Sequence, residues 1–264
     1  MIVPELPRYK FIYYNIMLNL YKVVGSSTDI IMANSSWTAN HCRNLWGGNS
    51  NIEIVYPPCN TTAFSVIPLP NPKKNRIVSF SQFRPEKDQI SQIRAFYELH
   101  KEHSELQAEF YMIGGCRHEE DIKLLKSLQK EAEDLGIAKH VFFKTNLPQE
   151  EVIHIMSEAK VAIHTMKNEH FGISIVEMMA AGLITIAHAS GGPYHDIIKE
   201  GANRGYLAKT IKEYSDSIYT AISSYDSRMQ TGLRENARDV AKKNFSDEAF
   251  MDNFEKYFSK VFHN

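Results

Sequence analysis

The sequence predicts an α/β fold, a parallel sheet with helices on both faces. From residue 76 to residue 208, short apolar runs alternate with amphipathic segments, and glycine-containing or charged turns separate them. Strands that alternate with helices of about 10–15 residues are typical of βαβ units. In such sheets ligands bind beyond the carboxyl ends of the strands, so the loops after strands are where a site is expected.

The composition is that of an ordinary globular protein. The 264 residues are 43% hydrophobic and 23% charged, with a formal net charge of −1. This balance provides no basic surface, so no nucleic-acid partner is expected. No apolar run reaches the roughly 20 residues of a membrane-spanning helix. The three scattered cysteines favour a reducing compartment, and without a CxxC or DxD pair no metal is expected.

Residues 1–56 resemble the last part of one Rossmann-like domain. Its expected elements are a helix over 11–24, a strand over 29–34, a helix begun by Ser35 or Ser36 and stopped by Gly47, and a strand over 51–58. Residues 57–75 hold five of the ten prolines and predict a linker, because proline removes a donor that strands and helices need.

Residues 76–208 predict a second Rossmann-like domain. Short apolar runs indicate its strands, over 77–83, 108–115, 140–145, 161–165, 183–188 and 205–208. Amphipathic segments indicate its helices, over 88–102, 119–135, 148–159 and 173–182, with a short helix after the glycine turn at 190–192. Residues 209–264 predict a set of C-terminal helices.

One strand-to-helix connection carries two acids. In NEHFGISIVEMMAAG (168–182), Gly172 stands at the expected helix start, where free N–H groups and the helix dipole favour an anion. Glu169 precedes this point, and Glu177 lies about 7 Å further along the helix axis. A nucleoside diphosphate joined to a hexose would span both, with its ribose on Glu177 and its sugar on Glu169. The alternative is that Glu177 lies on a solvent-facing surface, although its neighbours Ile173 and Ala180 are apolar.

Cations and glycines stand at other strand ends. Arg84 and Lys87 would neutralise a diphosphate leaving group or, alternatively, form a solvated turn. Gly191 and Gly192, like Gly114, either bring backbone N–H groups to a ligand or shape a tight turn. The patterns G-x-G-x-x-G and G-x-x-x-x-G-K-[ST] are absent, which disfavours hydride transfer and P-loop chemistry. Two histidines near the acids fit a core position and a sugar contact equally well, namely His164 and His170.

The segment from Glu169 to Glu177 resembles the E-x7-E signature of the retaining GT-B glycosyltransferases of family 4. The PEK at 85–87 and the later glycine pair fit the same family. Longer strings narrow the resemblance to the eukaryotic α-1,2-mannosyltransferases of the asparagine-linked glycosylation pathway. These strings are NSSWT (34–38), YPPC (56–59), SQFRPEKD (81–88), IGGCR (113–117), HTMKNEHFGI (164–173) and HASGGP (188–193).

The resemblance implies a role for each matching residue. Catalytic roles fall to Glu169 on the donor sugar and to Lys87 and Arg84 on the donor phosphates. Donor-binding roles fall to Glu177 on the ribose, Lys144 near the base, and Gly172, Ile173, Phe171, Gly191, Gly192 and Gly114. The chain departs from the family in two places. The usual Gly-Arg pair is Ser81-Gln82 here, and the acid after the glycine pair is Asp196.

The resemblance also implies an activity. Such an enzyme transfers mannose from GDP-mannose to a dolichyl-diphosphate-linked oligosaccharide, without cofactor or metal, at the cytoplasmic face of the endoplasmic reticulum membrane. Other mannosyltransferases are among the expected partners. A GT-B enzyme has two Rossmann-like domains, and this sequence is expected to carry the donor domain and only the end of the acceptor domain. Two alternatives stay open: a non-catalytic fragment that binds nucleotide sugar or a partner, and a family 4 enzyme that uses a UDP- or ADP-sugar.

Overall fold

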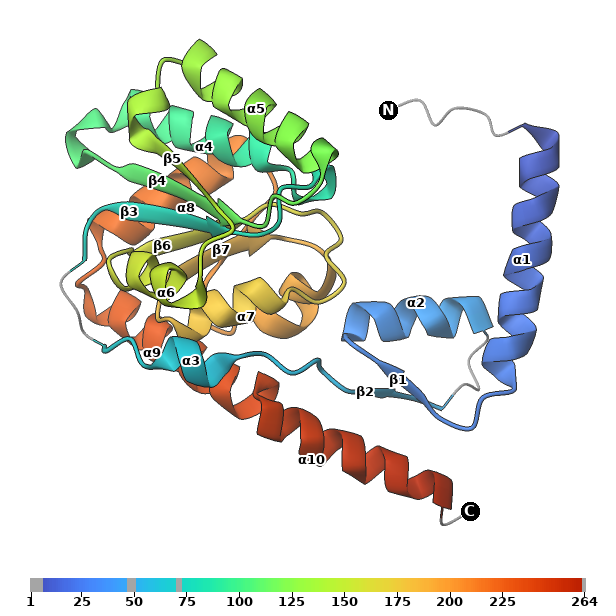
Figure 1. The fold of residues 1–264 in the computed structure, drawn as a ribbon. Coiled ribbons are helices and arrows are strands. Elements are labelled where there is room, and N and C mark those ends of the chain that lie inside the picture. Colours follow the sequence, from blue (N-terminus) through green and yellow to red (C-terminus); the bar gives the residue numbers. More distant parts are fainter. Residues whose placement is uncertain (1–6, 47–50, 70–72, 263–264) are drawn as a thin grey trace.

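The larger part of the molecule is a six-stranded parallel sheet (Figure 1). A computed structural model describes residues 7–46, 51–69 and 73–262. The strand order is β5-β4-β3-β6-β7-β8, and every pairing is parallel. The strands are β3 (Arg76–Phe80), β4 (Glu109–Gly114), β5 (Val141–Thr145), β6 (Val161–His164), β7 (Ile184–His188) and β8 (Tyr206–Ala208). The predicted α/β class and all six predicted strands are confirmed.

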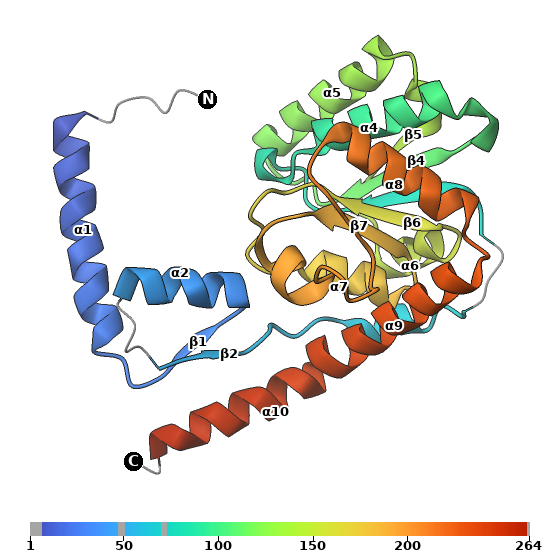
Figure 2. The ribbon, with the colours of Figure 1, turned by 180° about the vertical axis from the view of Figure 1, so that it is seen from behind.

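Helices cover both faces of this sheet (Figure 2). One face carries α4 (Gln89–Glu102), α5 (Glu119–Asp134) and α8 (Ile211–Ser223). The other face carries α6 (Gln149–Ser157), α7 (Ile173–Ala180) and α9 (Arg228–Phe245). Every residue of β6 and β7 is buried, as expected where helices exclude water from both faces of a parallel sheet.

A small N-terminal unit stands beside the sheet (Figure 1). It consists of α1 (Arg8–Ser26), β1 (Ile31–Ala33), α2 (Ser36–Trp46) and β2 (Ile52–Ile54), with β1 and β2 paired in parallel. Ser35 caps α2, because its hydroxyl accepts from the Thr38 N–H at 3.1 Å. The expected stop at Gly47 falls outside the described residues. Within the described chain, no helix combines the length and the apolar character needed to cross a bilayer.

The proline-rich connection is more structured than its composition predicts. It contains the short helix α3 (Thr61–Ser65), capped by Asn60, whose side chain accepts from the Ala63 N–H. Phe64 and Ile67 are buried in the core that α7 and α9 share. Hydrophobic burial therefore orders a segment that proline alone would leave extended.

The C-terminal part is helical, as the sequence predicts. After α9 the chain continues through α10 (Asp247–Phe258) and a 3-10 turn over Ser259–Phe262. Figure 1 shows α10 running away from the sheet and along the N-terminal unit. An ion pair of 3.2 Å between Lys260 Nζ and Glu53 Oε1 links the C-terminal turn to β2 of the N-terminal unit. The C-terminal helices thus bridge the large sheet and the small unit.

Candidate functional site

A cleft of about 770 Å³ opens at the carboxyl ends of β3, β4 and β6. Its wall on the sheet side comes from the loops that follow these strands and from the start of α7. Its opposite wall includes Asn34 and Pro57, which belong to the N-terminal unit and the connection after it. The cleft therefore lies where ligands bind in parallel α/β sheets, and two separate parts of the chain form it.

Most of the residues predicted for a site line this cleft. They are Arg84, Lys87, Gly114, Glu169, Phe171, Gly172, Ile173 and Glu177. Three others do not line it, namely Lys144, Gly191 and Gly192. Lys144 lies near the end of β5, the edge strand of the sheet, with β4 between it and β3.

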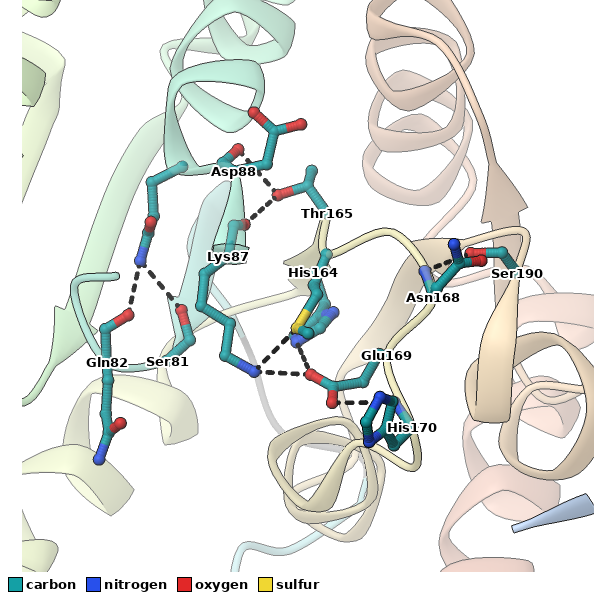
Figure 3. A network of polar contacts seen from close by, with 12 residues as sticks. Ser81, Gln82, Lys87, Asp88, His164, Thr165, Asn168, Glu169, His170 and Ser190 are labelled. Carbon is teal, nitrogen blue, oxygen red and sulfur yellow. Dashed lines mark hydrogen bonds and ion pairs between the residues drawn. The ribbon is translucent and has the colours of Figure 1, made fainter. Parts of the chain in front are cut away.

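Lys87 and Glu169 pair inside the cleft (Figure 3). Lys87 Nζ lies 2.6 Å from Glu169 Oε2, and the two side chains are 21% and 13% exposed. His164 Nε2 approaches the same oxygen at 3.4 Å. Burial raises the pKa of Glu169, but His164 and Lys87 outweigh it and lower this pKa to about 2. Glu169 is therefore ionised at neutral pH and already has a cationic partner.

His164 is a buried neutral ring. It is fully enclosed at the end of β6, and burial lowers its pKa more than the nearby carboxylate raises it. Of the two interpretations open from the sequence, the structure therefore favours the core position, with Nε2 directed at Glu169. A neutral imidazole adds no charge to the cleft, so Lys87 alone balances Glu169 among these three groups.

Hydrogen bonds fix the turn that carries Lys87. The Thr165 hydroxyl, just after β6, donates to the carbonyl oxygens of Lys87 and Asp88 at 2.8 and 3.0 Å. The same hydroxyl accepts from Gln92 Nε2 on α4 at 2.9 Å. Asp88 has a φ of 50°, which this network holds in the left-handed region. The loops after β3 and β6 are thus joined by hydrogen bonds beside the ion pair, and Figure 3 shows both sets of contacts.

The glycine pair supports the Glu169 loop from beneath. The Gly192 N–H donates to the Glu169 carbonyl at 2.8 Å. A Cβ on Gly191 would lie 2.2 Å from that carbonyl oxygen, and Gly191 has a φ of 63°. Ser190 Oγ accepts from the Asn168 N–H at 2.8 Å, on the other side of the loop. The sequence left two roles open for the glycines, a ligand contact or a tight turn. These contacts show the tight turn, in which the glycine backbone packs against the Glu169 carbonyl and fixes the loop that carries this acid.

The first turn of α7 faces the cleft. Gly172 precedes it with a φ of 116°, a conformation that glycine adopts without strain. Ile173 and Ser174 line the cleft at the helix end where backbone N–H groups lack intrahelical acceptors. The helix dipole adds partial positive charge at the same place. The start of α7 therefore presents to the cleft the backbone N–H groups that the predicted anion site requires.

Glu177 lines the cleft one turn further along α7 and has no partner. No hydrogen bond or ion pair joins its carboxylate to the rest of the described chain. Burial alone raises its pKa to about 7. Glu177 is half-buried in the wall of the cleft, so the structure does not support a fully solvent-facing position for it. The sequence argument that Glu177 lies among apolar residues was only partly right, since Ile173 is 44% exposed at the mouth of the cleft.

Sequence reasoning missed some lining residues. Arg117, His118 and Asp121 follow β4, and Asp121 caps α5 by accepting from the backbone N–H groups of Arg117 and His118 at 2.9 and 3.1 Å. Their place after a strand marked them as candidates. Asn34 and Pro57 stand in strings that carry the family resemblance, but no role was assigned to them, because only the fold brings their segments against the sheet.

Comparison with known protein families gives two matches. A family model described as glycosyl transferases group 1 matches residues 61–240. A second, described as ALG11 mannosyltransferase N-terminus, matches residues 4–46. The two matches fall on the two parts of the chain that form the cleft.

Two of the curated relatives carry the same name. A Homo sapiens protein named GDP-Man:Man(3)GlcNAc(2)-PP-Dol alpha-1,2-mannosyltransferase is 42% identical over 268 residues, which cover 98% of this chain and 54% of that protein. A Xenopus laevis protein of the same name is 44% identical, with coverage of 95% and 52%. The chain thus spans about half the length of the curated relatives it matches.

Solved structures show the same fold. A glycosyltransferase from Rickettsia africae superposes with a TM-score of 0.78 at 17% identity, over 99% of this chain and 69% of that one. The Anabaena protein Alr3699/HepE in complex with UDP gives 0.79 at 18% identity, over 92% and 67%. At these identities the likeness establishes the architecture alone. Because the first family model covers more than half of the sequence, the chain belongs to the group 1 glycosyl transferase family.

Proposed function

We propose that the cleft binds GDP-mannose and that the chain provides the donor side of an α-1,2-mannosyltransferase. The acceptor would be a dolichyl-diphosphate-linked oligosaccharide. The names of the curated relatives support this donor and acceptor. The observation that carries the proposal is the arrangement of an ionised Glu169, a helix start at Gly172 and an unpartnered Glu177 along one cleft wall.

The diphosphate would lie against the start of α7. Backbone N–H groups at Ile173 and Ser174 and the side chains of Arg84 and Lys87 all line this part of the cleft. Preorganised donors and cations of this kind stabilise the negative charge that develops on a departing nucleoside diphosphate. We propose that these protein groups, rather than a metal ion, carry out that task.

The two acids would hold opposite ends of the donor. Glu177 would accept hydrogen bonds from the ribose hydroxyls. These would provide its carboxylate with the partners that it lacks in the described chain. Glu169 would orient the mannose while Lys87 keeps it ionised. The bond between the mannose C1 and the GDP oxygen would break through an oxocarbenium-like state. The acceptor 2-hydroxyl would attack C1 from the leaving-group side and give its proton to the departing phosphate oxygen, with retention of the α configuration.

Calorimetry with GDP-mannose, GDP, UDP and ADP tests the donor. We expect GDP and GDP-mannose to bind and the other two nucleotides to bind more weakly. Equal or tighter binding of UDP or ADP would contradict the choice of GDP-mannose and favour a different family donor. If none of the four ligands bound, the proposal that this chain contains a donor site would be refuted.

The small size of the N-terminal unit favours a second candidate function, non-catalytic binding of a nucleotide sugar. In the described chain, the N-terminal unit and the connection after it contribute Asn34 and Pro57 to the lining of the cleft, and the sheet of that unit has two strands. A chain of this extent would bind a donor, whereas the positioning of an acceptor, which supplies a large part of the rate, would need further surface. Turnover of GDP-mannose with a lipid-linked acceptor by this chain alone would refute this non-catalytic alternative.

The proposed acceptor also suggests a location. A dolichyl-linked substrate resides in a membrane, and we propose the endoplasmic reticulum membrane, with the chain on its cytoplasmic face where GDP-mannose is available. The names of the relatives support a dolichol-linked substrate. Fractionation of cells that express the tagged chain, with protease protection of the microsomes, would test both the membrane and its face.

A further inference from the structure

Asn34 lines the cleft from the N-terminal unit, and its side chain carries an unsatisfied polar atom. It lies in the turn between β1 and α2 and lines the wall opposite the acids. Its Oδ1 is buried and has no hydrogen-bond partner within the described chain. A buried amide oxygen without a donor is destabilising, and such atoms are rare in folded proteins. A ligand in the cleft would supply the missing donor.

Asp196, which follows β7 of the large sheet, accepts hydrogen bonds that fix the turn carrying Asn34. The Ser36 N–H donates to Asp196 Oδ2 at 2.9 Å, and the Ser36 hydroxyl donates to Oδ1. The Tyr56 hydroxyl donates to the same Oδ1 at 3.0 Å. Asp196 is 7% exposed, so these three donors satisfy a carboxylate that would otherwise be buried without partners.

The loop that carries Asp196 also supports Glu169. Asp196 lies in the π-helical turn Pro193–Ile197, directly after Gly192, whose N–H donates to the Glu169 carbonyl. Across the same seam, the rings of Trp37 and His170 stack with centroids 5.2 Å apart. One loop therefore fixes the acid on one wall and, through Ser36, the asparagine turn on the other.

We infer that Asn34 contacts the nucleotide sugar directly and that Asp196 is the residue that positions it. The inference rests on the proposed function, because it assumes that the cleft binds a nucleotide sugar. The asparagine amide would accept a hydrogen bond from a ligand hydroxyl or N–H group, on the nucleotide or on the sugar. The donor would then be held between the two parts of the chain and would not lie on the large sheet alone.

Calorimetry on the full chain tests the role of Asn34. We expect Asn34→Ala to weaken GDP-mannose binding by about fivefold to tenfold, the effect of one lost hydrogen bond. A loss that appears with both GDP and GDP-mannose places the contact on the nucleotide, and a loss with GDP-mannose only places it on the sugar. Asn40→Ala is the matched control, because Asn40 is exposed on α2, the helix that follows Asn34, and its Oδ1 accepts from Arg43 Nη1.

A double-mutant cycle tests the role of Asp196. If Asp196 acts through Asn34, Asp196→Ala alone weakens binding about as much as Asn34→Ala, and the double variant is no weaker than Asn34→Ala. Asp196→Asn should restore part of the affinity, since its amide oxygen still accepts from the Ser36 N–H. Tyr56→Phe removes one donor and keeps the ring, so it provides a milder variant if Asp196→Ala does not fold.

Two results would separate the failure of this inference from that of the proposed function. Folded Asn34→Ala that binds GDP and GDP-mannose as tightly as the wild type would overturn the inference alone. Wild-type protein that binds neither ligand would overturn the proposed function and the inference with it. Additive losses in the cycle would overturn the positioning role of Asp196.

Discussion

Replacing Glu177 by glutamine should stabilise the unliganded protein and weaken its binding of the donor. The substitution keeps the shape of the side chain and removes its charge. The fold gives this carboxylate no partner, and burial raises its pKa from 4.5 to about 7. At pH 8 the wild-type protein must therefore keep a poorly solvated charge that the glutamine variant lacks.

The sign and size follow from linkage. A folded-state pKa above the unfolded value means that the folded protein holds the proton more tightly between about pH 4.5 and 7, so its stability falls across that window and levels off above it. At about 1.4 kcal/mol per pKa unit, the full effect is about 3 kcal/mol, an upper value because the cleft admits water. The stability of Glu177→Gln relative to the wild type should thus increase by up to about 3 kcal/mol from pH 4.5 to pH 8.

Urea denaturation at pH 4.5, 6 and 8 measures this difference, with Glu133→Gln as the control because Glu133 is exposed on α5. In parallel, calorimetry at pH 8 should show GDP-mannose binding weakened by about tenfold or more, since a charge-assisted hydrogen bond to the ribose is lost. A stability difference that does not change with pH would refute the burial argument. Unchanged affinity would refute the ribose assignment.

Three further predictions concern the rest of the cleft. Lys87→Met leaves Glu169 without its cation, so chemical denaturation at pH 7 should show a loss of about 2–3 kcal/mol, below the range for fully buried pairs; an unchanged midpoint would contradict the pairing. Gly191→Ala places a Cβ 2.2 Å from the Glu169 carbonyl, and thermal unfolding should reveal destabilisation of at least about 1–3 kcal/mol together with weaker donor binding. A variant that binds normally would show that the loop tolerates displacement. Treatment with EDTA should leave the affinity for GDP-mannose unchanged, because protein cations and the start of α7 are proposed to hold the diphosphate. Affinity that falls with EDTA and returns with magnesium would disprove this proposal.

The fold was predictable because its signals are local. Alternating apolar runs and amphipathic segments locate strands and helices without knowledge of their neighbours, and Gly172 marks a helix start by its position alone. The order of the strands is not a local property. The sequence predicted neither that β3 lies beside β6 nor that their loops meet. Lys87 and Glu169 are 82 residues apart, and both were assigned to ligand groups when the fold pairs them with each other.

The role of Gly191 and Gly192 also depended on neighbours in space that the sequence does not reveal. Two glycines after a strand suit a ligand-binding loop and a supporting turn equally well, and the distinction depends on what lies above them. The carbonyl of Glu169 lies there. The family resemblance placed Lys144 near the base, but β5 is an edge strand and Lys144 does not line the cleft. In both cases the missing information was the neighbour in space.

Two unsatisfied groups give the cleft a functional meaning that does not depend on family likeness. Glu177 and Asn34 both line the cleft, and neither the Glu177 carboxylate nor Asn34 Oδ1 has a partner within the described chain. A buried polar atom left without a hydrogen bond costs about 1–3 kcal/mol, a large share of the 5–15 kcal/mol that keeps a domain folded. An apolar side chain at position 34 would remove that cost, and one at position 177 would remove a half-buried charge. The two polar groups therefore oppose stability and favour the binding of a hydroxyl-rich ligand. The same reasoning gives opposite signs for stability and affinity at Glu177, which no purely structural role for this residue would produce.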